Sequence, residues 1–77
     1  MQSDLRAVLL DLIQVPPRLR GLKDHRVEVL AQDIGFQGLL QPILVQAVAG
    51  GFRLVDGAHR LAAVRQLGWT EVAAQVL

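Results

Sequence analysis

The stretch RLVDGAHRLAAVRQLGW, residues 53–69, joins the pattern of a β-strand to that of an α-helix. Residues 52–55 form a short apolar run, whereas residues 58–67 carry apolar side chains at helical spacing. Gly57 stands at the junction, and Gly68 stands where the helix is expected to stop. The pattern predicts a helix over 58–67 whose inward-facing side chains are Leu61, Ala62, Val64 and Leu67.

The segments on either side of this stretch predict further strands. Residues 43–48 are rich in apolar and branched side chains, and Gly50-Gly51 permits a tight turn into residues 52–55. We therefore expect a β-hairpin that leads directly into the helix. Beyond the helix, the sequence EVAAQVL at residues 71–77 predicts a closing strand.

The first half of the chain predicts one strand and one helix. Residues 8–13 are interpreted as a short strand, which the two prolines that follow would terminate. Residues 24–36 have a helical period, with Asp24 as the expected N-cap and Gly35 or Gly38 as the expected stop. The apolar face of this helix consists of Val27, Leu30, Ala31 and Ile34.

The predicted order is strand, helix, hairpin, helix and strand. Such an order is typical of a small α+β domain with a mixed β-sheet and two or three helices. A chain of 77 residues is long enough for one hydrophobic core and too short for two. We expect a single domain over residues 1–77, with residues 5–77 as its core.

The composition excludes several classes of function. Because the chain has no cysteine, it has no disulfide, no thiol nucleophile and no cysteine ligand for zinc, and we predict no metal site. A net charge of +1 falls short of the basic excess of a dedicated nucleic-acid binder, although basic residues cluster within 18–23. No apolar run is long enough to cross a bilayer, and the first residues lack the pattern of a signal peptide. We therefore expect a cytoplasmic protein with no membrane partner.

The apolar fraction of 52% is high for so short a chain. A small domain cannot bury that much apolar surface, so we expect an exposed apolar patch. Such a patch predicts a contact with a partner, with a second copy in a homodimer, or with further domains of a longer protein.

The strand-to-helix junction has the chemistry of a phosphate site. A helix N-terminus exposes unpaired amides and a partial positive charge, and Gly57 lets an anion approach them closely. Arg60 adds a guanidinium that can hold phosphate through two bonds, and His59 adds a further donor. Simpler roles stay open, because Gly57 could serve only the turn and His59 could sit at the rim of the core. Arg60 could instead pair on the surface with Asp56 or Glu28.

Few other side chains indicate a chemical role. Asp56 is interpreted first as a helix cap rather than as a base or a metal ligand. Asp56 and His59 are nevertheless the two candidates for a catalytic role beside the junction. Trp69 is interpreted as a packing residue, and His25 as a solvated one.

Two motifs and their separation resemble the ParB/sulfiredoxin superfamily. GLLQPILV at residues 38–45 and DGAHRLAAVRQLGW at residues 56–69 resemble its Gly-x-x-Gln-Pro and Gly-x-x-Arg elements. The similarity extends back through VLAQDIGFQGLLQPI at residues 29–43 to VPPR at residues 15–18. It covers residues 8–77 and implies a ParB N-terminal-like domain with the element order β-α-β-β-α-β.

The resemblance implies a site for a nucleoside triphosphate, CTP or ATP, with Mg²⁺ as a candidate companion ion. In the superfamily the Gly-x-x-Arg loop holds nucleotide phosphates, and the Gly-x-x-Gln-Pro loop lies by the base of a bound cytidine nucleotide. An early arginine that also reaches the phosphates corresponds to Arg18, with Arg20 as the alternative. The residues implied to hold phosphates are Gly57, Ala58, His59 and Arg60, and those implied to lie by the base are Gly38, Gln41 and Pro42.

Departures from the superfamily pattern limit the activities that it implies. ParB partition proteins carry Gly-Glu-Arg-Arg where residues 57–60 are Gly-Ala-His-Arg, which counts against CTP switching of the partition kind. Sulfiredoxin carries Gly-Cys-His-Arg, and Ala58 replaces its nucleophile, so sulfinic-acid reduction is excluded. In the helix that contacts the nucleotide in sulfiredoxin, Arg26 keeps a basic side chain, whereas Val29 and Asp33 replace Ser and Thr.

The leading hypothesis is a nucleotide-binding domain of a DNA partition or regulatory protein. Such a domain would contact DNA only through domains that this chain lacks. The alternatives are an ATP-dependent phosphotransferase or nuclease-like enzyme of the same superfamily, and an interaction module with a decayed nucleotide site.

Overall fold

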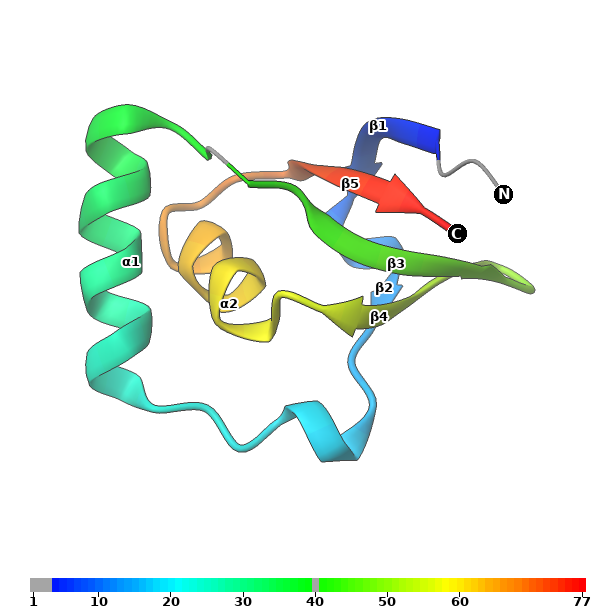
Figure 1. Ribbon diagram of the computed structural model, residues 1–77, viewed down its shortest axis with the longest axis horizontal. Helices are drawn as coiled ribbons and strands as arrows, with labels where there is room; N and C mark the ends of the chain where they lie inside the picture. Colours follow the sequence, from blue (N-terminus) through cyan, green and yellow to red (C-terminus); the bar gives the residue numbers. More distant parts are fainter. Residues whose placement is uncertain (1–3, 40) are drawn as a thin grey trace.

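The computed structural model describes residues 4–39 and 41–77 (Figure 1). Residues 1–3 of the predicted domain, and Leu40 of the Gly-x-x-Gln-Pro segment, lie outside the described residues. The predicted α+β class with a mixed sheet is confirmed. In chain order the elements are β1 (Asp4–Leu9), the 3₁₀ turn η1 (Leu10–Leu12), β2 (Ile13–Gln14), the 3₁₀ turn η2 (Pro17–Leu19), α1 (Asp24–Gln37), β3 (Ile43–Val48), β4 (Gly51–Asp56), α2 (Ala58–Gln66) and β5 (Glu71–Val76).

The five strands follow the order β1-β5-β3-β4-β2 across one sheet. β1 with β5 and β3 with β4 are antiparallel pairs, whereas β3 with β5 and β2 with β4 are parallel. The register aligns apolar residues of neighbouring strands on one face, as in the pairs Val8–Val72 and Val45–Leu54. α2 lies between α1 and the strands, so it is packed on two sides (Figure 1).

The connection between β1 and β2 forces the sheet to curl. These strands lie at opposite edges of the sheet, yet residues 10–12 alone join them. Four Cα steps span at most about 14 Å, whereas four interstrand spacings of a flat sheet amount to about 19 Å. The edges therefore approach each other, and the guanidinium carbon of Arg6 on β1 lies 5.6 Å from the centre of the Phe52 ring on β4.

The prediction of one continuous strand over residues 8–13 is wrong. The structure divides this segment among the end of β1, the turn η1 and the start of β2. The division follows from the curl, because the chain must leave one edge of the sheet and join the other within three residues. The Leu10 amide donates to the Thr70 carbonyl oxygen at 3.0 Å, which ties η1 to the segment before β5.

The second predicted helix is confirmed, with a different buried face. Leu61 and Val64 are buried as expected, but Ala63 is also fully buried, whereas Leu67 is exposed. Ala62 is half-buried and packs against the core. The helical pattern of the sequence predicted a single buried face. The buried surface of α2 is wider because α1 and the sheet cover the helix from two directions.

The predicted N-caps of both helices are wrong. The N-cap of α1 is Lys23, and Asp24 is the first helical residue, where its charge still favours the helix dipole. The N-cap of α2 is Gly57 rather than Asp56, which ends β4 and is exposed. Neither N-cap makes a side-chain capping bond. Of the two glycines proposed to end the first helix, Gly38 is the C-cap.

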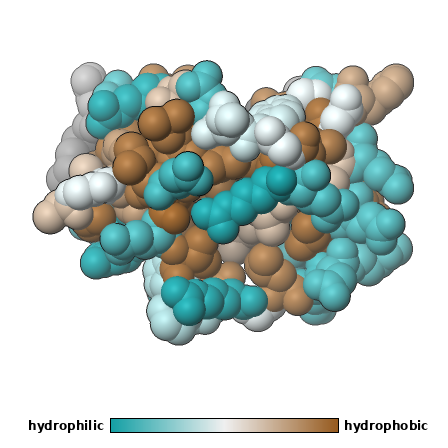
Figure 2. Space-filling model, turned by 180° about the vertical axis from the view of Figure 1, so that it is seen from behind, coloured by the Kyte–Doolittle hydropathy of each residue, from teal (hydrophilic) through white to brown (hydrophobic). Residues whose placement is uncertain are grey.

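The composition predicted an exposed apolar patch, and the structure shows exposed apolar side chains on several separate elements. Within the described residues seven large apolar side chains are exposed, and Phe36 on α1 is the most open, at 91%. Figure 2 shows apolar and polar residues interleaved over the far face of the molecule. None of the helices in residues 4–39 and 41–77 is long and apolar enough to span a membrane.

The substitution Gly51→Ala is expected to lower the free energy of unfolding by about 1–3 kcal/mol. The added Cβ would fall on the Leu12 carbonyl oxygen, where η1 crosses the start of β4. Gly21→Ala is the matched control, because no atom lies within 4 Å of its Cβ position. Urea unfolding followed by circular dichroism measures both variants. Equal stability of the two would contradict the close approach of η1 and β4.

Candidate functional site

A cavity of about 340 Å³ lies at the N-terminus of α2. One wall is a face of α1, and the opposite wall is the junction between β4 and α2. The third side comes from the segment that follows α1. Such a volume is in the range of small-molecule sites. Its lining residues are Arg26, Leu30, Asp33, Ile34, Gly38, Leu39, Gln41, Asp56, Gly57, Ala58, His59 and Arg60.

Gly57 determines how the chain enters this site. Its φ of 102° is a left-handed conformation that residues with a side chain adopt at a cost. A Cβ at this position would also lie 2.9 Å from Ile43 Cγ2 and 3.0 Å from Arg60 Nη2. The chain can therefore turn sharply from β4 into α2. The first residues of α2 line the cavity, and their backbone amides have no acceptor within the helix.

The Arg60 guanidinium forms no ion pair with the residues that the structure describes. Its Nη2 donates to the Pro42 carbonyl oxygen over a long distance of 3.4 Å. Its Nε is buried and has no acceptor among the residues that the structure describes. In this same part of the chain the one ion pair joins Arg6 to Asp4 at 3.4 Å, so Arg60 pairs with neither Asp56 nor Glu28.

The His59 imidazole links the two helix N-termini. Its Nε2 accepts a hydrogen bond from the Lys23 amide, the N-cap residue of α1, at 3.2 Å. An accepting Nε2 carries no proton, so a proton on the neutral ring resides on Nδ1. His59 is half-buried and lines the cavity, so the same ring both holds α1 in place and faces the site.

α1 contributes two charged residues that the sequence analysis did not include among the site residues. Arg26 and Asp33 both line the cavity, whereas Val29 is 50% exposed and lies outside it. Asp33 accepts a hydrogen bond from the Gln37 side-chain amide at 2.6 Å. The helical period of the sequence could have identified Arg26 and Asp33 as site residues, since residues 26, 30, 33 and 34 share one side of a helix.

The structure brings most of the predicted residues to this cavity and leaves some outside it. Pro42 contributes its carbonyl oxygen to Arg60 without lining the cavity. Arg18 is exposed on η2 and does not line it. Arg20, the alternative, lines a different groove, and its Nε donates to the Val15 carbonyl oxygen at 2.9 Å. The predicted residues that line the cavity are Gly38, Gln41, Gly57, Ala58, His59 and Arg60, together with the weak catalytic candidate Asp56.

No cluster of metal-ligating side chains is found in the part of the chain that the structure describes. Among those residues, no three His, Cys, Asp or Glu side chains gather closely enough to hold a metal ion. Asp33 and Asp56 do line the cavity, together with Arg26 and Arg60. The cavity therefore combines two acidic and two strongly basic side chains around the helix N-terminus.

Comparison with known proteins identifies one family for nearly the whole chain. The ParB N-terminal domain family matches residues 2–77. The probable plasmid-partitioning protein ParB of Thermus thermophilus is 41% identical over 70 residues, which are 88% of this chain and 23% of that protein. A nucleoid occlusion protein of Halalkalibacterium halodurans is 41% identical over 51 residues, which are 66% of this chain and 18% of that protein. The chain thus spans only a small part of these relatives.

Solved structures share the fold. Sulfiredoxin from Arabidopsis thaliana superposes with a TM-score of 0.86 and 28% identity, over 96% of this chain and 84% of that one. The truncated chromosome-partitioning protein ParB of Caulobacter crescentus, complexed with CTP-γ-S, superposes with a TM-score of 0.84 and 29% identity. That match covers 96% of this chain and 44% of the Caulobacter chain.

The substitution His59→Leu is expected to lower the free energy of unfolding by about 0.5–1.5 kcal/mol, because the Lys23 amide loses its acceptor. Amide hydrogen exchange at Lys23, measured by NMR, should become faster in this variant. His25→Leu is the control, since His25 is exposed on the first turn of α1. Unchanged exchange at Lys23 in His59→Leu would show that the bond does not order this segment.

Proposed function

The chain belongs to the ParB N-terminal domain family, and we propose that it binds a nucleoside triphosphate, CTP or ATP, in the cavity at the N-terminus of α2. The phosphates would lie against Gly57, Ala58, His59 and Arg60. The domain would serve as the nucleotide-binding part of a DNA partition or regulatory protein, since curated relatives include partition proteins. Any contact with DNA would belong to domains outside this chain.

The buried Nε of Arg60 is the observation that carries this proposal. A buried donor without an acceptor costs about 1–3 kcal/mol, and more when the group is charged. Arg60 keeps this donor beside the cavity and beside the free amides of α2. A phosphate oxygen would satisfy the guanidinium and the amides together, and the helix dipole would favour its charge.

The other end of the cavity suits a base. Leu30, Ile34 and Leu39 give that region apolar surface, and Gln41 adds a side-chain amide that can both donate and accept. Binding of a CTP analogue by the Caulobacter ParB protein, whose fold and sequence are similar, supports a nucleotide as the ligand class. Sulfinic-acid reduction remains excluded for this chain, because it has no cysteine.

A divalent ion is expected to accompany the nucleotide. The carboxylates of Asp33 and Asp56 offset the charges of Arg26 and Arg60, so the cavity lacks a large positive excess. A free triphosphate would be repelled by the two carboxylates at close range. Mg²⁺ on the phosphates reduces that repulsion, so affinity should be higher with Mg²⁺ than with a chelator present.

Calorimetric titration with CTP, ATP and GTP in Mg²⁺ tests the site. Arg60→Ala is expected to weaken binding about 10- to 150-fold, the equivalent of losing charged hydrogen bonds of about 1.5–3 kcal/mol. Arg65→Ala is the matched control, because Arg65 is on the same helix but lines a different cavity, and it should bind like the wild type.

The same titration separates the alternatives. Equal affinity of wild type and Arg60→Ala would refute the phosphate role of Arg60. Absence of binding by all three nucleotides would favour an interaction module with a decayed site. If the wild type releases phosphate from the nucleotide, and Asp56→Ala still binds the nucleotide but no longer releases phosphate, the protein is an enzyme rather than a binding domain. Asp56 is the sharper probe of turnover, because the Nε2 atom of His59 already accepts from Lys23.

A further inference from the structure

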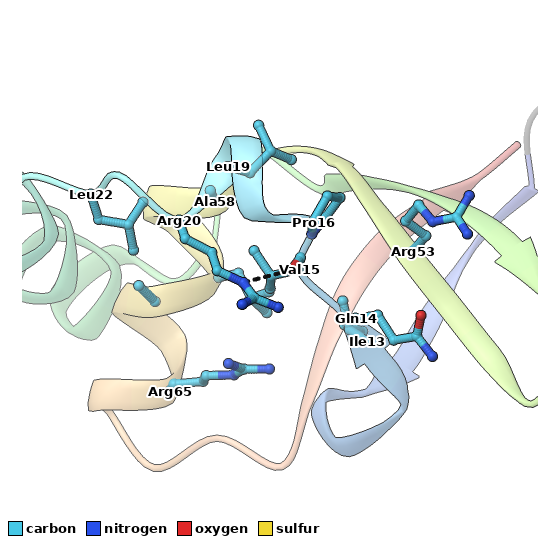
Figure 3. A pocket seen from close by; sticks show the side chains of 12 residues that line it. Ile13, Gln14, Val15, Pro16, Leu19, Arg20, Leu22, Arg53, Ala58 and Arg65 are labelled. Atoms are coloured by element: carbon cyan, nitrogen blue, oxygen red, sulfur yellow. Dashed lines mark hydrogen bonds between the residues drawn. The ribbon is translucent and has the colours of Figure 1, made fainter.

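A second and larger cavity, of about 750 Å³, lies on the other side of α2 (Figure 3). The segment from β2 through η2 forms one wall, and α2 forms the other. We refer to this cavity as the η2–α2 groove. None of its charged lining residues is among those that line the proposed nucleotide cavity. Its apolar lining consists of Ile13, Val15, Pro16, Leu19, Leu22, Ala58, Leu61 and Ala62.

The charged residues of the groove all have the same sign. Arg20, Arg53 and Arg65 line it, and no acidic residue does. In Figure 3 the Arg20 and Arg65 side chains extend into the space between η2 and α2, whereas the Arg53 side chain on β4 extends away from them. Across residues 4–39 and 41–77 the one ion pair joins Arg6 to Asp4, so no carboxylate there pairs with the groove arginines.

This arrangement is complementary to carboxylates combined with apolar side chains. Two guanidinium groups directed into one space repel each other until an anion lies between them. Arg20 is held in place by the bond from its Nε to the Val15 carbonyl oxygen, which leaves its terminal nitrogens to face the groove. A guanidinium so fixed can hold a carboxylate through two bonds.

We propose that the η2–α2 groove docks a peptide segment of a protein partner, with an apolar side chain on the groove floor and Asp or Glu side chains beside Arg20 and Arg65. Among the described residues, the apolar lining of the groove contains no aromatic side chain. This favours a peptide over single-stranded nucleic acid, whose bases stack on aromatic rings. Peptide sites share an apolar centre and a charged rim. In the groove, half-buried Leu19 and Leu22 provide the apolar centre, and exposed Arg65 provides the charged rim.

The proposal is independent of nucleotide binding and can be tested alone. A displayed library of random linear peptides is selected against the full chain. The Arg65→Glu variant is kept for the later affinity measurements, and it is expected to fold because Arg65 is exposed in the last turn of α2. The selected peptides should be enriched in Leu, Ile or Phe next to Asp or Glu.

Variant affinities for a selected, fluorescently labelled peptide then locate the site. Arg20→Ala and Arg65→Ala should each weaken binding about two- to fivefold, as for partly exposed ion pairs, and Arg65→Glu about tenfold or more. Arg18→Ala is the matched control, because Arg18 is exposed on η2 but does not line the groove. Arg60→Ala should also bind the peptide normally, since Arg60 lines the other cavity.

Each outcome decides the proposal. Enrichment of acidic, apolar peptides whose binding depends on Arg20 and Arg65 supports it. Failure to enrich any sequence, enrichment of basic peptides, or equal binding by Arg65→Glu overturns it. Equal competition by single-stranded DNA, with no requirement for an apolar side chain, overturns it in favour of a nucleic-acid groove. If a variant that has lost nucleotide binding still binds the peptide, the groove proposal is supported independently of the nucleotide proposal.

Discussion

The short link between β1 and β2 is the constraint on which the rest of the structure depends. Residues 10–12 must join the two edges of a five-stranded sheet, so the sheet cannot remain flat. The curled sheet covers one side of α2 and α1 covers another, so Ala63 and Val64 of α2 are completely buried. Because α2 is held in this way, its N-terminus has a fixed position beside α1. The cavity at Gly57 is a consequence of that position rather than a separate feature of the surface.

The parts of the fold that were predictable depend on local chemistry. The hairpin over β3 and β4 and the turn into α2 follow from glycines and branched residues close together in the chain. The division of residues 8–13 was not predictable in this way, because it depends on where β1 and β2 lie in the sheet. The caps proposed at Asp24 and Asp56 failed for a related reason, since backbone geometry placed Lys23 and Gly57 at the N-cap positions.

The candidate site shows the same division between local and global information. The resemblance assigned Gly38, Gln41 and the residues at 57–60 to one site, and the fold brings them to one cavity. Arg26 and Asp33 were compared with the nucleotide-contacting helix of sulfiredoxin but were not included among the site residues, although both line the cavity. Arg18 is exposed on the turn η2 and does not line the cavity. The direction of a side chain on a short turn depends on tertiary contacts that sequence spacing does not report.

The hydrogen bond between Lys23 and His59 joins a residue next to the η2–α2 groove to a residue that lines the first cavity. His59 lines the cavity at Gly57, and Lys23 directly follows Leu22 on the wall of the η2–α2 groove. A ligand that drew the imidazole toward itself would release this wall and change how readily the groove accepts an occupant. Because linkage is reciprocal, an occupant of the groove would alter affinity at the first cavity by the same factor. If both cavities bind ligands, this one backbone amide is the contact through which the two binding events would be coupled.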